Sequence, residues 1–226
     1  TERLRIDSTG DVRFAGNNFT NNTNKNVNIT APSYNTSEED VNLVQVENES
    51  GFNQISFGGG TSALNAATTL RFLTAPAVNT TTGTERLRID SSGRVLTPNQ
   101  PGFRVYSPSG AANSIITFAS TEYNIGNHMN AATGVFTAPI AGRYLFTFAI
   151  LSGNPLGSYV RINFCKNSTT IDTSLGDALW DGLTTYGSPG MAMIFNLAAN
   201  DTIRLRAEGS GTYGTSYGSF SGILLA

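Results

Sequence analysis

Two stretches of the chain alternate between apolar and polar residues, which is typical of a β-strand with one solvated face. Residues 159–164 (YVRINF) place Val160, Ile162 and Phe164 on one side, and residues 202–207 (TIRLRA) repeat the pattern. An antiparallel sheet with one face on a core and the other in water produces this alternation. We therefore expect both stretches to lie in an outer sheet of a β-sandwich.

Three further stretches are apolar on both faces: Arg143–Ile150, Met191–Leu197 and Ser219–Ala226. One face of such a sheet packs on its sister sheet, and the second face has to be covered by something else. The sequence contains no helical pattern that would supply the cover, so we expect a second copy of the chain there.

The N-terminal part contains an internal repeat. The string TERLRIDS occupies residues 1–8 and again residues 84–91, and each copy continues to a glycine and then a valine. Leucine and isoleucine alternate with charged residues in each copy, which predicts a strand that ends in a Ser-Gly turn. Burial of the two apolar side chains of such a strand contributes about 4 kcal/mol of stabilisation, which is less than the cost of ordering its backbone. The strand therefore has to pair with a neighbouring segment or another chain.

Between the two copies, apolar residues are sparse. The sequence predicts short strands at Val41–Val46, Gln54–Phe57 and Leu70–Leu73, separated by segments rich in Asn, Thr, Ser and Gly. We see no core that a single chain could build there. Residues 1–100 are accordingly interpreted as a trimeric β shaft, with a flexible linker as the alternative. Residues 101–226 are predicted to form a separate head domain, after a Pro- and Gly-containing segment at residues 97–102.

Composition excludes several classes of function. The formal net charge is −2 and 13% of residues are charged, whereas a nucleic-acid partner calls for a basic face. Cys165 and His128 are the only residues of their types, which excludes disulfide frameworks and Cys- or His-rich metal sites. No apolar run approaches the roughly 20 residues of a membrane helix, so no membrane insertion is expected. Because the chain begins inside the repeat motif, we expect it to be a piece of a longer protein.

Two family resemblances extend this reading. The string ERLRIDSSGRV at residues 85–95 resembles the repeat of bacteriophage tail-fibre proteins. In the C-terminal part, TGVFTAPIAGRYLFTF at residues 133–148 and FSGILL at residues 220–225 resemble the globular head of complement component one, subcomponent q, which is similar to the tumour-necrosis-factor family. The Ala199-Asn200-Asp201 turn departs from that pattern, in which a glycine often precedes the aspartate.

The second resemblance implies an all-β fold: a ten-stranded jelly-roll β-sandwich in a tight homotrimer. It also implies that aromatic residues of the inner sheet lie along the threefold axis. By position, the expected core and trimer contacts are Tyr144, Phe146, Phe195 and Phe220.

Aromatic residues in irregular stretches of the head are the candidate ligand-binding residues. They are Trp180, the only tryptophan, together with Tyr186, Tyr213 and Tyr217. Aromatic rings on loops stack on sugar rings or anchor protein interfaces. The competing interpretation is that Trp180 fills the core.

Metal binding and catalysis have weaker candidates. Asp172, Asp177 and Asp181 are close in sequence and offer oxygen ligands for calcium, but a solvated loop is the simpler interpretation and no other cofactor is implied. Residues 214–218 (GTSYG) fit a nucleophile-elbow pattern, but the required strand-to-helix turn is missing and His128 is the only candidate base. We expect no enzyme activity. A depolymerase-type fibre tip would need a pair of carboxylates, which we do not find.

The sequence is therefore interpreted as the distal segment of a phage tail fibre. It would be an extracellular homotrimer on the virion that joins other tail proteins and adheres to a host surface polysaccharide or outer-membrane protein. Two alternatives remain. The head is a trimerisation module for the fibre, or the chain is a secreted adhesion or recognition protein of a cellular organism.

Overall fold

The computed structural model describes residues 4–6, 12–14, 20–153, 159–170, 172, 175–181, 186–213 and 216–225. The chain divides into two units, Thr1–Thr97 and Pro98–Ala226. Residues 98–101, which precede the strands of the head, belong to the second unit, and the Pro101 carbonyl accepts a hydrogen bond from the Leu224 amide at 2.9 Å. Among the described residues, no helix is long and apolar enough to cross a membrane.

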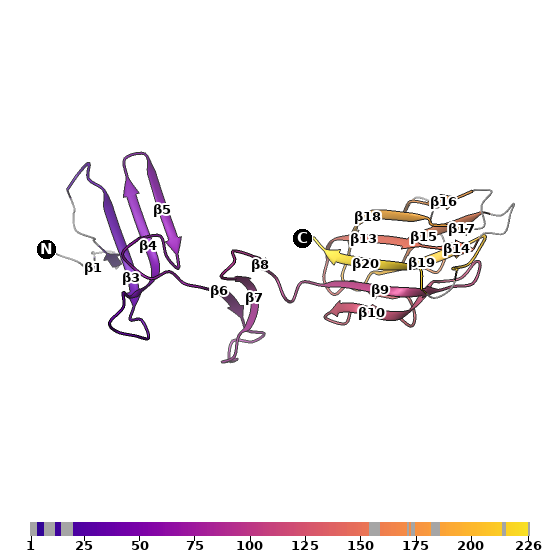
Figure 1. The fold of residues 1–226 in the computed structure, drawn as a ribbon, viewed down its shortest axis with the longest axis horizontal. Helices are drawn as coiled ribbons and strands as arrows, with labels where there is room; N and C mark the ends of the chain where they lie inside the picture. Colours follow the sequence, from indigo (N-terminus) through magenta and orange to yellow (C-terminus); the bar gives the residue numbers. More distant parts are fainter. Residues whose placement is uncertain are drawn as a thin grey trace. The chain divides into compact units, whose positions relative to one another are not determined.

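The second unit is a sandwich of two five-stranded antiparallel sheets. The first sheet has the order β10 (Thr117–Ile125), β9 (Gly102–Ser109), β20 (Gly218–Leu224), β13 (Gly142–Ile150), β18 (Gly190–Leu197). The second has the order β11 (Met129–Asn130), β12 (Val135–Thr137), β19 (Thr202–Glu208), β15 (Val160–Lys166), β16 (Ala178–Trp180). Figure 1 labels all strands of the first sheet and β15, β16 and β19 of the second. Ten strands in two sheets match the jelly roll that the resemblance implied. A short ladder joins β14 (Ser152–Gly153) to β17 (Tyr186–Gly187).

Aromatic rings from both sheets fill the space between them. Phe146 from the first sheet lies 5.9 Å from Phe195 and 5.9 Å from Phe220, measured between ring centroids, and Phe164 of β15 lies 5.3 Å from Phe195. Tyr144 is fully buried and its hydroxyl donates to the Ile140 carbonyl at 2.9 Å, which satisfies the buried phenol.

These positions revise the resemblance-based expectation for the inner sheet. Tyr144, Phe146, Phe195 and Phe220 are core residues within one chain, because their rings lie between its two sheets. Their side chains are covered before any partner arrives, so the face that is open to a second copy has to be formed by the residues that alternate with them.

The other face of the first sheet carries an apolar row that crosses all five strands. The pairing register aligns Ile125 with Gly102, Gly102 with Ile223, Ile223 with Leu145, and Leu145 with Ile194. Ile194 is 58% exposed, Ile223 46% and Ile125 36%. We call these five residues the apolar row. The two-faced strands expected from the sequence are therefore present, and one of their faces is open to solvent in the single chain.

In the tight turn before β19, Asn200 stands where the family pattern often has a glycine. Asn200 adopts a φ of 72°, a left-handed conformation that asparagine tolerates better than most residues. The Asp201 carboxylate accepts hydrogen bonds from the Ala198 amide at 2.9 Å and the Asn167 side chain at 2.7 Å, and pairs with Lys166 at 2.9 Å. The Asn167 and Lys166 hydrogen bonds are the main reason why the pKa of Asp201 is lowered to about 2.

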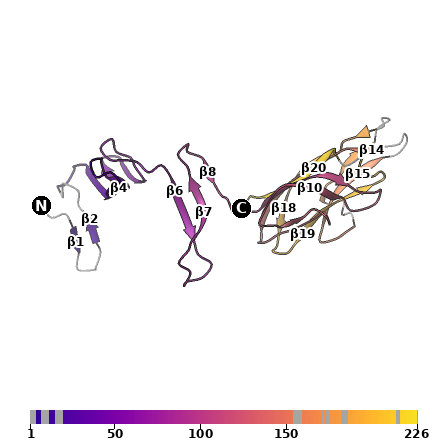
Figure 2. The ribbon, with the colours of Figure 1, turned by 60° about the horizontal axis from the view of Figure 1, so that its bottom comes forward.

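The first unit contains three small antiparallel sheets, of which β1–β2 and β6–β7–β8 are labelled in Figure 2. The strands are β1 (Leu4–Ile6), β2 (Val12–Phe14), β3 (Lys25–Ala31), β4 (Val41–Glu49), β5 (Phe52–Phe57), β6 (Leu70–Thr74), β7 (Thr84–Ile89) and β8 (Val95–Leu96). In the described part of this unit no hydrophobic side chain is buried, and the buried side chains are those of Asn42 and Gln45.

The sequence repeat is a repeated hairpin with one register. Ile6 pairs with Val12 in the first copy, and Ile89 pairs with Val95 in the second. In the second copy the Asp90 side chain accepts from the Ser92 and Arg94 amides, both at 3.0 Å, and Gly93 adopts a φ of 77°. The Arg94 guanidinium, which donates to Asp90 at 2.8 Å, is the main cause of the lowered pKa of that carboxyl. The corresponding turn of the first copy lies outside the described residues.

Candidate binding surface

The aromatic candidates come together at one end of the sandwich, where Figure 1 shows β14, β16 and β17. Tyr186 lies in β17, opposite Gly153 of β14. Tyr213 follows β19, Tyr217 precedes β20, and Trp180 ends β16. We call these four aromatic residues the aromatic end. Their shared location is a product of the tertiary fold, since the outermost two are 37 residues apart in sequence.

Three tyrosines of the aromatic end are connected by contacts through the central one, Tyr213. The Tyr186 and Tyr213 rings are 4.5 Å apart in an edge-to-face arrangement, and the Tyr186 hydroxyl donates to the Tyr213 hydroxyl at 3.2 Å. The Tyr213 and Tyr217 rings stack at 6.1 Å. The pKa of Tyr213 is raised, chiefly by its hydrogen bond with Tyr186. Each ring therefore holds the next one in place.

Two glycines make room for the rings. A Cβ on Gly187 would overlap the Trp180 indole, and a Cβ on Gly153 would lie 3.2 Å from Cδ2 of Tyr213. Trp180 therefore lies against the backbone next to Tyr186. Sequence reasoning missed this role, although glycines outside turns, close to clustered aromatic residues, are the signal that would have pointed to it.

The aromatic end is a surface feature. Trp180 is 38% exposed, and the tyrosines are 40–54% exposed. The alternative that Trp180 fills the core is therefore wrong. Large aromatic rings bury much area at little entropic cost when a ligand or partner covers them.

The three aspartates do not form a metal site. Among the described residues, no group of three or more His, Cys, Asp or Glu side chains lies in a metal-binding arrangement. Asp177 instead pairs with Arg161 at 3.0 Å and accepts from the Asn163 amide at 3.3 Å.

The nucleophile-elbow candidate is also separated from its base. Ser216 lines a hollow on the first sheet with Tyr106 and Glu122, whereas His128 lines a groove on the second sheet. Gly214 and Thr215 of the motif lie outside the described residues. The two side chains line different hollows, so they do not form a catalytic pair.

Comparison with known proteins gives the family. Residues 103–225 match the sequence profile of the C1q domain. Complement C1q tumor necrosis factor-related protein 3 of Homo sapiens is 30% identical over 115 residues, which cover 50% of this chain and 45% of that protein. Caprin-2 of Danio rerio is 28% identical over 118 residues, 51% of this chain and 12% of that protein. The match therefore spans less than half of either relative.

Among solved structures, the globular domain of zebrafish complement 1qA aligns with a TM-score of 0.45 and 16% identity, over 56% of this chain and 98% of that domain. The profile match covers the two sheets, the aromatic core and the FSGILL end of β20. Domains of this family bind and do not catalyse, in agreement with the sequence prediction. The chain belongs to the C1q domain family.

Proposed function

We propose that this chain is the homotrimeric recognition part of an extracellular adhesion protein, and that its head binds a surface ligand through the aromatic end without catalysis. The observation that carries the proposal is the gathering of four exposed aromatic residues at one end of the sandwich. C1q-family proteins are usually secreted, which supports the extracellular setting.

The exposed apolar row supports the proposal that the chain forms a trimer. Domains of this family typically form homotrimers, and the row leaves isoleucine side chains exposed in one chain. Three copies would present three aromatic ends, so that weak contacts combine into an avidity gain of about 100-fold or more where the geometry allows it. The first unit then contributes a shaft whose exposed apolar residues, such as Phe57 and Phe72, are covered between chains.

A glycan array that carries bacterial surface polysaccharides and animal glycans tests this proposal. Trp180→Ala is expected to weaken binding at least tenfold, because it removes a ring of the size that dominates interfaces. Tyr34→Ala is the matched control, since Tyr34 is fully exposed in the first unit. Equal binding of every glycan on the array by the wild type and the Trp180 variant would contradict the assignment of the aromatic end.

A second candidate function is the distal segment of a phage tail fibre. The observation in its favour is the hairpin that recurs with the same Ile–Val register in both ERLRIDS copies. The relatives named above come from animals and do not support it, so a secreted adhesion protein of a cellular organism agrees better with the comparisons. In the tail-fibre case the ligand is a host polysaccharide or outer-membrane protein, and the head also sets the register of the shaft.

The two candidates differ in where the protein is found. An antibody raised against residues 98–226 labels the tails of purified virions if the chain belongs to a fibre. Labelling restricted to a secreted fraction, with no virion band, supports the cellular adhesion protein.

A further inference from the structure

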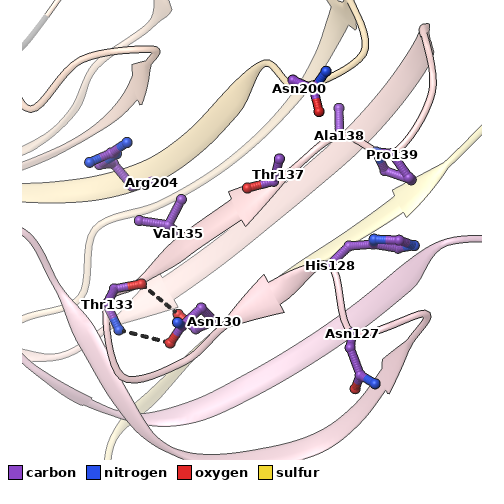
Figure 3. A pocket seen from close by; sticks show the side chains of 10 residues that line it. All are labelled: Asn127, His128, Asn130, Thr133, Val135, Thr137, Ala138, Pro139, Asn200 and Arg204. Carbon is purple, nitrogen blue, oxygen red and sulfur yellow. Dashed lines mark hydrogen bonds between the residues drawn. The ribbon is translucent and has the colours of Figure 1, made fainter.

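A groove lies on the outer face of the second sheet, away from the aromatic end and the apolar row. Val135 and Thr137 of β12 and Arg204 of β19 line it, while Phe136 and Ile203, which alternate with them, are buried in the core. Figure 3 shows Arg204 and His128 on opposite sides, with Val135 and Thr137 between them. Strand alternation thus directs these side chains outward.

The groove has the size of a small-ligand site. Its volume is about 650 Å³, within the range of roughly 300–1,000 Å³ that ligand pockets occupy. It is open along one side, so it suits a segment of a chain molecule better than an enclosed ligand. Because the apolar row is on the other sheet, self-association through that row leaves the groove accessible.

The charge of the groove is positive and not compensated. Arg204 lines it, and no carboxylate does. Within the described part of the chain Arg204 forms no ion pair, and its Nη2 donates to the Thr202 hydroxyl at 3.1 Å. Its Nε is buried and has no hydrogen-bond partner, so the donors left for a ligand are those of the two Nη atoms. The nearby Asp201 carboxylate is already engaged by Lys166. A guanidinium with spare donors is suited to a carboxylate.

Apart from Arg204 and His128, the lining is neutral and combines polar with apolar side chains. It consists mainly of amide and hydroxyl side chains with a few small apolar ones, and His128 adds an imidazole at the edge. The neutral polar residues are Asn127, Asn130, Thr133, Thr137 and Asn200. The Asn130 side chain is itself oriented by a bond from the Thr133 amide at 3.2 Å. Groups that both donate and accept match the hydroxyls of a sugar.

We infer that this groove binds a saccharide that carries a carboxylate, with Arg204 as the carboxylate contact and the amide and hydroxyl side chains as contacts to ring hydroxyls. The observations favour an acidic sugar over a neutral one, because a neutral sugar leaves the Arg204 guanidinium without an anion. They favour a sugar over a simple anion, because most of the lining is neutral. This site is independent of the aromatic end and of the proposed ligand there.

Calorimetric titration of the full chain with tetragalacturonate and with neutral galactotetraose tests the inference. The acidic tetramer is expected to bind at least tenfold more tightly than the neutral one. Arg204→Gln is expected to lower affinity for the acidic tetramer about tenfold or more, since it removes a charge-assisted hydrogen bond. Arg206→Gln is the matched control: Arg206 is on the same strand and face but bonds to the Thr169 carbonyl at 3.0 Å and does not line the groove. Its affinity is expected to stay within twofold.

Several results would overturn the inference. They are no binding of tetragalacturonate, equal binding of the neutral tetramer, or equal losses in the Arg204 and Arg206 variants. Inorganic phosphate that binds as tightly as tetragalacturonate would show a simple anion site and remove the sugar assignment. Thermal unfolding of both variants is the check that each is folded, so that a loss of binding is not attributed to misfolding. Trp180→Ala is expected to leave this titration unchanged, which separates the groove from the aromatic end.

Discussion

Replacing Gly222 by alanine places a methyl group inside the aromatic core of the head. The new Cβ would lie 2.5 Å from Cε1 of Phe103, and 2.6 and 2.7 Å from two ring carbons of Phe146. Both rings are buried and packed against further aromatic rings, so neither can move aside cheaply. Overpacking of this kind costs about 1–3 kcal/mol.

Gly102→Ala is the control for packing within one chain, because Gly102 lies in the neighbouring strand β9 and its new methyl group would face the apolar row and not the aromatic core. A Cβ there would meet its nearest atom, the Gly222 carbonyl oxygen, at 3.5 Å, an ordinary contact. Urea and thermal unfolding of the full chain measure both variants at one protein concentration, since assembly makes the melting temperature depend on concentration.

For a unit of this size, each kcal/mol corresponds to about 4 °C in melting temperature. Gly222→Ala is therefore expected to lower the transition of the head by about 4–12 °C, and Gly102→Ala by much less. Equal stability of the two variants, or a Gly222 variant as stable as wild type, would refute the packing argument. It would also remove the explanation for the glycine in the FSGILL end.

Three further predictions address the turn, the aromatic end and the apolar row. The pKa of Asp201 lies below its ordinary value of 3.8, at about 2, so the ionised Asp201 carboxylate stabilises the folded head above pH 4, and this contribution is lost as the pH falls to about 2. Asp201→Asn should therefore flatten the part of an acid-unfolding curve between these pH values. An unchanged curve would contradict this assignment. Tyr186→Phe removes the hydrogen bond that raises the pKa of Tyr213, so ultraviolet titration should show the Tyr213 phenolate forming at lower pH than in the wild type. A higher pKa of Tyr213 in the variant would show that this hydrogen bond is not the cause. Leu145→Glu puts a charge in the apolar row and should dissociate the proposed trimer, which sedimentation velocity measures. The far-ultraviolet circular dichroism spectrum should stay that of the wild type, because the fold of each chain is retained. A variant that still sediments as a trimer would argue against the row as the interface.

The two-faced strands show how much of the fold the sequence could predict. Alternation in Arg143–Ile150 placed Phe146 and Leu145 on opposite faces, and in the structure Phe146 is buried while Leu145 lies in the apolar row. Period-2 patterning is a local property, so it can be read without the tertiary structure. It gives two faces but does not say which of them is the core.

That missing information explains the revision for Tyr144, Phe146, Phe195 and Phe220. Their positions were right for a buried role, but the side that meets the sister sheet is decided by how the two sheets stack. The departure at Asn200 was recognised in the sequence. Its consequence, a left-handed residue that keeps the Asp201 turn without glycine, required the backbone conformation.

The binding surfaces depend still more on the tertiary fold. Trp180 and the three tyrosines could be selected by type and by their irregular surroundings, but their contacts arise where β14 meets β17. The groove was not predicted, because Asn130 and Arg204 belong to no recognised motif and His128, the only histidine, was considered only as a candidate base. The topology joins them by pairing β12 with both β11 and β19.

The central claim is that one chain leaves the apolar row uncovered and that two further copies cover it. The molar mass of the full chain in dilute buffer tests this directly by size-exclusion chromatography with multi-angle light scattering. The account predicts three times the chain mass of 23.9 kDa, about 72 kDa. A mass of 23.9 kDa that persists as protein concentration rises would contradict it.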